Sequence, residues 1–111
     1  MTNEDAVEGL KALAHPLRLK IVQALAGVER NVGEIDAIAA VGQPALSQQL
    51  AVLRAAGLVQ TRREAKQVFY RVDDLRLGAL GEVVSALVPE TAGPTIAPAS
   101  AVGVARFARL G

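Results

Sequence analysis

The sequence predicts a mostly α-helical fold with one β-hairpin, and two patterns in its 111 residues predict it. Apolar residues recur at helical spacing in four stretches before residue 57 and in one stretch after residue 73. Between them, "LVQTRR" and "QVFYRV" are rich in β-branched and aromatic residues and indicate a hairpin around "EAKQ". Helices followed by a basic hairpin are the order of elements in a winged helix-turn-helix.

The first three helices are expected from their apolar faces and their end signals. Residues 6–14 place apolar side chains three apart on one face. Pro16 then opens a second helix, and Gly27 is a plausible stop for it. Asn31 is expected to cap a third helix, with Glu34 in its first turn near the positive end of the helix dipole.

A fourth helix, expected over residues 43–56, carries two distinct faces. Gly42 is expected to cap it, Pro44 falls in its first turn, and Gly57 ends it. Three leucines at i, i+4 and i+7 form the face expected in the core, namely Leu46, Leu50 and Leu53. The other face is polar or short near the N-terminus, and it consists of Gln43, Pro44, Ser47 and Gln48.

That polar face has two interpretations. Taken alone, it is compatible with an ordinary solvated helix, although such a face more often carries Lys and Glu. Gln can present a donor and an acceptor to an adenine edge, Ser can meet a base or a phosphate, and Pro can touch a thymine methyl. The basic hairpin that follows favours DNA, because a winged helix-turn-helix places its second helix in the major groove and its wing on phosphates.

A fifth helix is expected between residue 73 and Pro89. Its apolar side chains follow the spacing of a wide core-facing stripe, made by Leu80, Val83, Val84, Leu87 and Val88. The remainder, residues 91–111, is Pro-interrupted and aperiodic, and we expect it to be a weakly ordered tail.

The composition excludes several classes of function. The chain has no cysteine, which rules out disulfides, thiolate metal sites and thiol sensing. The acidic side chains of the last helix come with no imidazole, so we expect no metal site and no cofactor. His15 is the single histidine, and in "HP" it is expected to cap or pack at a helix junction.

The same inventory argues against an enzyme and against a membrane protein. No histidine stands beside a nucleophile, and there is no phosphate-binding glycine loop or paired-carboxylate pocket. No apolar run approaches the roughly 20 residues that a spanning helix needs, and the acidic start does not suit a signal peptide. We expect a cytoplasmic protein without catalytic activity.

Three stretches together resemble a known family. "LKALAHPLRLKIVQAL", "VGQPALSQQLAVLRAAGLV" and "TRREAKQVFYRV" are similar to the ArsR/SmtB family of bacterial winged-helix repressors, over about residues 7–88. The resemblance implies a homodimer, with residues 1–90 as its DNA-binding and dimerisation domain. Two recognition helices would face successive major grooves of an imperfect palindrome, and the hairpin over 58–72 would lie on the backbone.

The resemblance also implies roles for individual residues. The base-facing residues would be Gln43, Pro44, Ser47 and Gln48. The residues on the DNA backbone and in the wing would be Arg54, Arg62, Arg63, Lys66 and Gln67. The α-helical dimer interface would be formed by Val7, Leu10, Leu80, Val83, Val84 and Leu87. Pro44 stands where similar proteins often have Ser, and Gln49 where His is usual, so the base preference is expected to differ.

Two functions from different classes remain. The first is a homodimeric, sequence-specific repressor whose partner is double-stranded DNA, released by a small organic ligand, by a protein antagonist or by no signal. The second is a winged-helix protein-interaction module that uses its last apolar helix and binds no specific DNA. DNA affinity at low salt discriminates between them.

Overall fold

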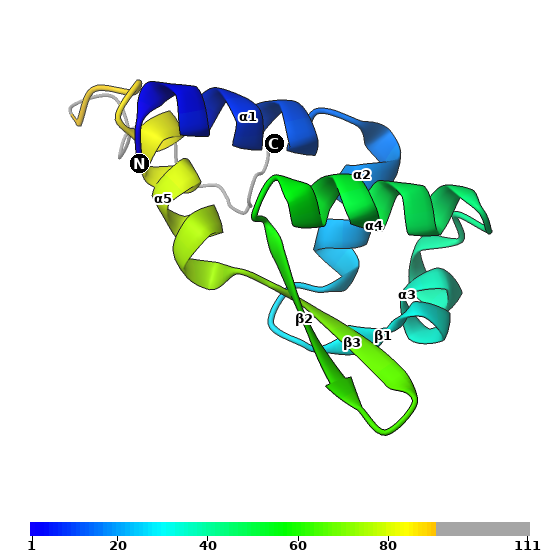
Figure 1. Ribbon diagram of the computed structural model, residues 1–111. Coiled ribbons are helices and arrows are strands. Elements are labelled where there is room, and N and C mark those ends of the chain that lie inside the picture. Colours follow the sequence, from blue (N-terminus) through cyan, green and yellow to red (C-terminus); the bar gives the residue numbers. More distant parts are fainter. Residues whose placement is uncertain (91–111) are drawn as a thin grey trace. The chain divides into compact units, whose positions relative to one another are not determined.

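The computed structural model describes residues 1–90, and the chain divides after Gly81 into two units. Five helices and three strands follow one another (Figure 1). Their bounds are α1 (Asn3–Leu13), α2 (Pro16–Ala24), β1 (Arg30–Asn31), α3 (Val32–Ala39), α4 (Ala45–Ala55), β2 (Val59–Glu64), β3 (Gln67–Val72) and α5 (Asp74–Ser85). The predicted fold class, helices with a hairpin wing, is confirmed, and the predicted tail over 91–111 lies outside the described residues.

The ends of α1, α2 and α3 follow from their capping chemistry. Helix α1 begins at Asn3 rather than at residue 6, because the Thr2 hydroxyl accepts from the Asp5 amide and the Asp5 carboxylate accepts from the Thr2 amide. Asn31 and Glu34 form the same reciprocal capping box at the start of α3, as predicted. Gly27 takes a positive φ of 72° after α2, a conformation that favours glycine.

Two further predicted helix boundaries were wrong. Gly42 does not cap α4, since its φ is +83° and the helix begins at Ala45, with Pro44 at the cap position making no side-chain cap. Helix α5 ends at Ser85 and not at Pro89. Beyond Ser85 the amides of Leu87 and Val88 donate three residues back, which is the tighter turn that often closes an α-helix.

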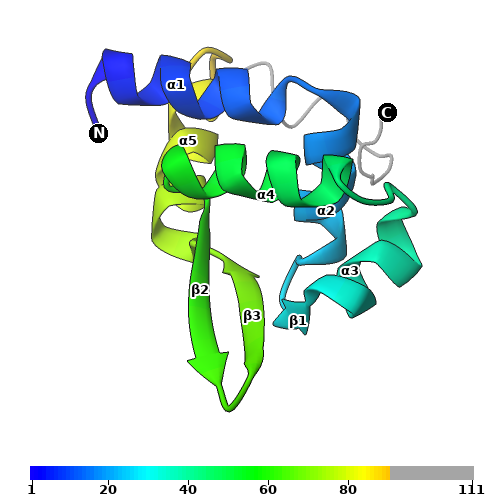
Figure 2. The same cartoon turned by 45° about the vertical axis from the view of Figure 1, so that its right-hand side comes forward.

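The wing is a three-stranded antiparallel sheet in the order β1-β3-β2. In the hairpin, Val59 pairs with Val72 at one end and Glu64 with Gln67 at the other, so the turn lies at residues 65–66 as predicted. The third strand, β1, was not predicted from the sequence. Its two residues pair with β3, Arg30 opposite Tyr70 and Asn31 opposite Phe69, and they place the start of α3 beside the hairpin (Figure 2).

Helix α4 packs in the core against two helices and the wing. Helix α2 packs against α3 and α4, and α4 also contacts α1 and β2. The three predicted leucines of α4 are fully buried, and so are Ile21, Leu25, Ile35, Leu58 and Val59. Gly9 of α1 lies against Leu80, where an added Cβ would stand 3.1 Å from a Leu80 methyl carbon. Core packing therefore explains the leucine face of α4.

The Asp73 side chain fixes the start of α5. Its Oδ1 accepts from the Arg76 amide at 2.9 Å, and its Oδ2 accepts from the side-chain amide of Gln60 at 2.8 Å. These hydrogen bonds favour the charged carboxylate and hold the pKa of Asp73 below its ordinary value. Asp73 therefore ties the base of the wing to the last helix.

We expect Asp73→Ala to lower the free energy of unfolding by about 1 kcal/mol at neutral pH, because the helix loses its cap. A carboxylate whose folded pKa is depressed stabilises the fold above its unfolded pKa of about 3.9 and loses that contribution as the pH falls through the folded value. The difference between wild type and Asp73→Ala, measured by urea unfolding, should therefore shrink as the pH falls below the unfolded pKa.

Asp73→Asn is the matched control, since it keeps a capping oxygen and removes the titration. The difference between Asp73→Asn and Asp73→Ala should stay constant with pH. A wild-type difference that is equally constant would contradict the assignment of the depressed pKa to Asp73.

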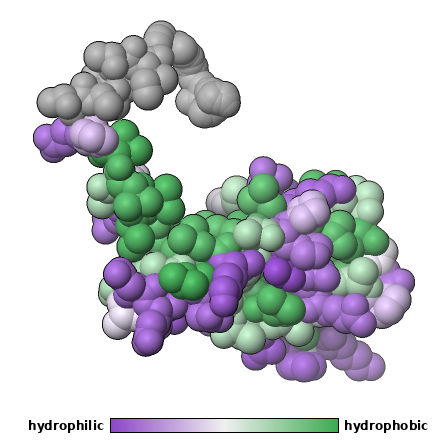
Figure 3. Space-filling view, turned by 90° about the horizontal axis from the view of Figure 1, so that it is seen from above, coloured by the Kyte–Doolittle hydropathy of each residue, from purple (hydrophilic) through white to green (hydrophobic). Residues whose placement is uncertain are grey.

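The face that carries α1 shows apolar and polar side chains side by side (Figure 3). None of the helices within residues 1–90 is long and apolar enough to cross a bilayer.

Candidate nucleic-acid interface

The N-terminal end of α4 presents the four predicted base-facing residues to solvent. Gln43, Pro44, Ser47 and Gln48 are all exposed. Gln43 Oε1 accepts from the Ser47 amide at 3.1 Å and from the Ser47 hydroxyl at 2.8 Å, and this holds the Gln43 side chain against the first turn of the helix. The Gln43 NH₂ group, the Ser47 lone pairs and the whole Gln48 amide are left to meet other groups.

The turn between α3 and α4 is shaped by a residue that sequence reasoning missed. Asp36 Oδ1 accepts from the backbone amides of Val41 and Gly42 at 2.9 and 2.8 Å. This satisfies two amides that follow the end of α3, where Ala40 adopts a left-handed conformation. Asp36 therefore sets the path of the chain into α4, and the sequence carried no periodic signal for it.

A second positioning contact fixes α4 from the other side. Arg18 on α2 donates to the Ala12 carbonyl at 2.6 Å and to Gln49 Oε1 at 2.8 Å, so one guanidinium joins the end of α1 to α4. Gln49, noted in the sequence as a departure from the family pattern, is thus the α4 anchor for Arg18. It is half-buried and does not belong to the exposed face formed by Gln43 and Gln48.

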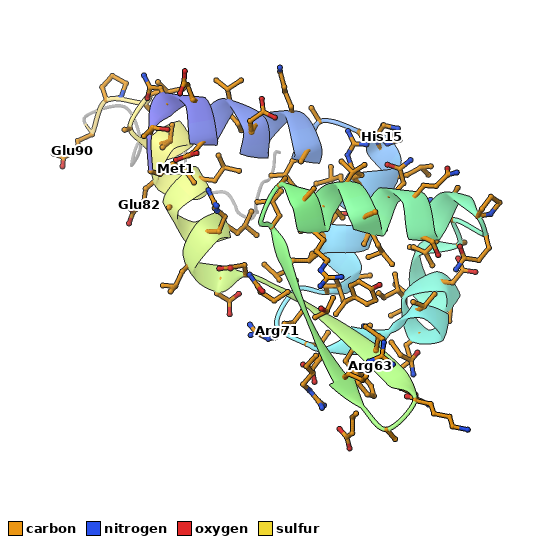
Figure 4. The ribbon with its side chains drawn as sticks, in the orientation of Figure 1. Met1, His15, Arg63, Arg71, Glu82 and Glu90 are labelled. Carbon is orange, nitrogen blue, oxygen red and sulfur yellow. The ribbon has the colours of Figure 1, made fainter. Side chains whose placement is uncertain are left out.

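His15 caps α2, as predicted. Its Nδ1 accepts from the Leu17 amide at 3.1 Å at the junction of α1 and α2, where Figure 4 labels it. Among residues 1–90, no three His, Cys, Asp or Glu side chains lie close enough together to bind a metal ion.

The wing cations fall into two groups. Arg62 pairs with carboxylates of its own chain, since it donates to Glu29 at 2.7 Å and to Glu64 at 2.6 Å, and its guanidinium lies 4.8 Å from the centre of the Phe69 ring. The hydrogen bonds that Arg62 donates to Glu64 and Glu29 raise the pKa of Arg62 above its already high value. Its side chain remains 47% exposed, but two carboxylates neutralise its charge.

The other predicted wing residues are exposed. Arg63 lies near the tip of the hairpin (Figure 4), Lys66 lies in its turn, and neither pairs with a carboxylate among the described residues. Gln67 Oε1 accepts from the Asn31 side chain at 3.2 Å, which joins the hairpin to the cap of α3. Arg71 lies nearer the base of the hairpin and is also exposed.

A hollow separates α4 from β3 and brings together residues from both. Arg54 and Ser47 line it on the helix side, and Tyr70 lines it on the strand side. Tyr70 was not among the predicted site residues, because its alternation with Phe69 and Arg71 only indicated a strand. Helix α4 and the wing therefore enclose a polar-edged groove beside the predicted backbone contact, Arg54.

The predicted interface residues differ in exposure. Val7 and Leu10 on α1 are exposed, as are Val84 and Leu87 further along the chain, while Val83 is partly exposed. Leu80 is different, because it is 2% exposed and packs on Gly9 within the same chain. Leu80 therefore belongs to the core of the protein and not to an outer surface.

Comparison with known proteins gives concordant matches. Residues 15–61 match the family model described as "Bacterial regulatory protein, arsR family". The chain is 53% identical over 78 residues to the biofilm growth-associated repressor of Agrobacterium fabrum, covering 70% of this chain and 67% of that protein. It is 44% identical to the transcriptional activator HlyU of Vibrio cholerae, covering 74% of this chain and 76% of that protein.

Comparison of the fold with solved structures agrees with these sequence matches. The crystal structure of the transcriptional repressor BigR from Xylella fastidiosa superposes with a TM-score of 0.61 at 39% identity. The superposition covers 81% of this chain and 100% of that one.

Proposed function

Because the chain belongs to the ArsR family of bacterial regulatory proteins, and not to a family of enzymes, we propose that it is a homodimeric, sequence-specific DNA-binding repressor that reads an imperfect palindrome. The N-terminal face of α4 would enter the major groove, and the wing would lie along the backbone. The observation that carries the proposal is the exposed Gln43, Ser47 and Gln48 face standing over a fully buried leucine stripe.

The polar chemistry of that face supports base recognition. Gln48 carries a donor and an acceptor on one planar amide, which can pair with the adenine edge in the major groove. Gln43 is held by Ser47 through its carbonyl oxygen, so it would present chiefly its NH₂ group, a donor for guanine or thymine acceptors. Short side chains at Pro44 and Ser47 would let the helix approach the base edges closely.

Backbone contacts would come from the exposed cations. Among the cations assigned to the DNA backbone, Arg63, Lys66 and Arg54 form no ion pair with a carboxylate within residues 1–90. Arg62 would act differently, as a positioning residue, because Glu29 and Glu64 already occupy its guanidinium. Gln67 would support the wing through Asn31.

The dimer interface would use the exposed apolar side chains Val7 and Leu10 on α1, with Val83, Val84 and Leu87. Leu80 would support the α1 part of the interface from inside by packing on Gly9. A regulator that meets the bacterial chromosome works in the cytoplasm, so the expected location belongs to the same proposal.

The same apolar side chains favour the second candidate function, a protein-interaction module. Leu87 is 79% exposed and Val88 51%, and an apolar surface of this kind binds another protein as readily as a second copy. In that case the exposed face of α4 would be an ordinary solvated surface, and no specific DNA sequence would be preferred.

The deciding experiment is selection of bound DNA from a random library with the purified protein, at low and moderate salt. We expect an enriched imperfect palindrome whose half-sites lie about one helical turn apart. A dimer that enriches no sequence at either salt concentration would overturn the repressor proposal and favour the interaction module.

Substitutions should separate base contacts from phosphate contacts. We expect Gln48→Ala to weaken binding to the selected site by about 1–3 kcal/mol and to leave binding to random DNA unchanged. Lys66→Ala should weaken both and reduce the slope of log affinity against log salt by about 1. Fluorescence anisotropy with both DNAs at several salt concentrations measures these effects.

Arg62→Ala is the matched control for Lys66→Ala. Both remove one positive charge from the hairpin, but the charge of Arg62 is already paired, so its removal should change the salt slope less. Equal slope changes for the two variants would contradict the positioning role of Arg62.

A further inference from the structure

A hollow of about 460 Å³ lies between α1 and α4, within residues 1–81. Its lining carries charges of both signs, namely the cations Lys11, Arg18 and Arg76 and the carboxylates Asp5 and Glu8. The rest of the lining is small and apolar, namely Val52 and three alanines. The volume is within the range of small-molecule sites, and the mixture of an apolar floor with a few charged groups is typical of them.

The uncompensated charge in this α1–α4 hollow is positive. Three cations line the hollow against two carboxylates. Glu8 pairs with Lys11 at 3.8 Å, and the pKa of Asp5 is lowered by its hydrogen bonds with Thr2 and, to a smaller extent, by the charge of Arg76. Arg18 donates only to neutral oxygens, two backbone carbonyls and Gln49 Oε1. Within the described residues neither Arg18 nor Arg76 forms an ion pair, and both are partly buried.

Arg76 is held at the hollow by the shape of the backbone. Its guanidinium lies over Gly57, where an added Cβ would stand 3.1 Å from Nε and from Nη2. Gly57 has a φ of +77° and ends α4, so the residue that terminates the helix also makes room for this cation. Two arginines from different elements thus line one cavity, and a carboxylate is the group that matches the planar fork of an arginine.

Arg18 connects the hollow to the face of α4 proposed to read DNA. Three of the five guanidinium N–H groups are used in the contacts to Ala12, Lys11 and Gln49, which leaves two to bind an anion. An anion bound by these two N–H groups would share the guanidinium with Gln49 and draw it towards the hollow. The contact between α1 and α4 would then weaken or shift, and with it the placement of the exposed α4 face.

On α1, most of the residues that line the hollow lie on a different helix face from the residues assigned to the dimer interface. Asp5, Glu8 and Ala12 follow one another at i, i+3 and i+7 on one face of α1. Val7 and Leu10, the exposed apolar residues assigned to the interface, lie on another face of the same helix, about half a turn away.

We propose that the α1–α4 hollow binds a small organic carboxylate between Arg18 and Arg76, and that this anion is the effector that changes DNA affinity through the Arg18–Gln49 contact. The second half of the proposal rests on the proposed function. The first half does not, and the two are tested separately.

Benzoate is the probe for binding, and benzamide, which has the same shape without the charge, is its control. Amide NMR spectra of the full chain should show saturable benzoate shifts confined to residues around the hollow in α1, α4 and the start of α5. Benzamide should cause none. Arg76→Gln should weaken benzoate binding by about tenfold or more, because a charge-assisted hydrogen bond is lost. Arg71→Gln, which removes the same charge from an exposed strand position, should leave it unchanged.

Ala56→Leu narrows the hollow without changing its charge. If Arg76→Gln does not fold, Ala56→Leu still tests whether benzoate binds in the hollow. It should also abolish the benzoate shifts. Shifts that do not saturate, that benzamide reproduces, or that persist in both variants would overturn the binding site.

The regulatory half is measured on the DNA selected as above. Benzoate at saturation should change the affinity of the wild type for that DNA and leave the affinity of Ala56→Leu unchanged. Saturable binding without any change in DNA affinity would overturn the effector role and keep the site. Loss of specific DNA binding in the absence of benzoate would instead refute the proposed function, and the NMR result would still stand.

Discussion

Leu53→Ala is expected to lower the free energy of unfolding by about 2–5 kcal/mol, the range for truncating a leucine in a packed core. Leu53 lies on α4 with no exposed surface, and its carbonyl accepts from the Leu58 amide as the chain leaves the helix. A cavity here would lie beneath the proposed recognition helix, so DNA affinity should fall with stability. Urea unfolding followed by circular dichroism measures the effect.

Val52→Ala is the matched control, because Val52 is the preceding residue of the same helix and is 41% exposed. Its truncation should cost less than about 1 kcal/mol, since much of the side chain already meets water. Similar losses for the two variants would mean that the leucine stripe is not the packed core of the fold.

Arg18→Ala is expected to lower the free energy of unfolding by roughly 1.5–3 kcal/mol, the range for hydrogen bonds made by a charged group. The change removes the donors to Ala12 and Gln49 and leaves a part-buried carbonyl without a partner. Because α4 loses its tie to α1, affinity for the selected DNA should also fall. Urea unfolding and fluorescence anisotropy provide the two measurements.

Two further variants separate the charge of Arg18 from its geometry. Arg18→Lys keeps the positive charge but cannot reach both oxygens with one planar group, so it should behave more like Arg18→Ala than like wild type. Gln49→Ala removes only the α4 end of the link and should cost less stability while still weakening DNA binding. Full retention of both properties by Arg18→Lys would show that charge alone matters.

Local signals in the sequence predicted the order of elements well. The Asn31 and Glu34 capping box, the stop at Gly57 and the buried leucines all depend on residues within one or two turns of each other, and all were confirmed. The errors at the start of α4 and at the end of α5 have a similar local origin. A glycine just before a proline usually indicates a helix start, but the positive φ of Gly42 moves the start of α4 further along the chain. A proline after an apolar run usually indicates a helix end, but α5 already ends in the tight turn after Ser85.

Contacts between distant residues could not be predicted in this way. Strand β1 has two residues, too few to show any periodicity, and exists because β3 offers it partners. The Arg62 ion pair with Glu29 and the Arg18 bond to Gln49 join positions 33 and 31 residues apart, and Leu80 is buried by Gly9. Each of these contacts changes the role that composition alone gave to a charged or apolar residue. The base-facing and interface residues themselves stay predictions.

The ion pair between Arg62 and Glu29 has a consequence for how binding data should be analysed. It joins the hairpin to the segment between α2 and β1 across an exposed surface, so added salt screens it together with the phosphates. A hairpin whose orientation depends on ionic strength presents Arg63 and Lys66 differently at each salt concentration. The number of counterions deduced from the slope would then exceed the number of phosphates that the protein touches. A Glu29→Gln variant lacks this ion pair, and its DNA affinity should be measured over the same salt series. The difference between its slope and that of the wild type gives the contribution of the ion pair, and the remaining slope gives the contribution of the phosphates.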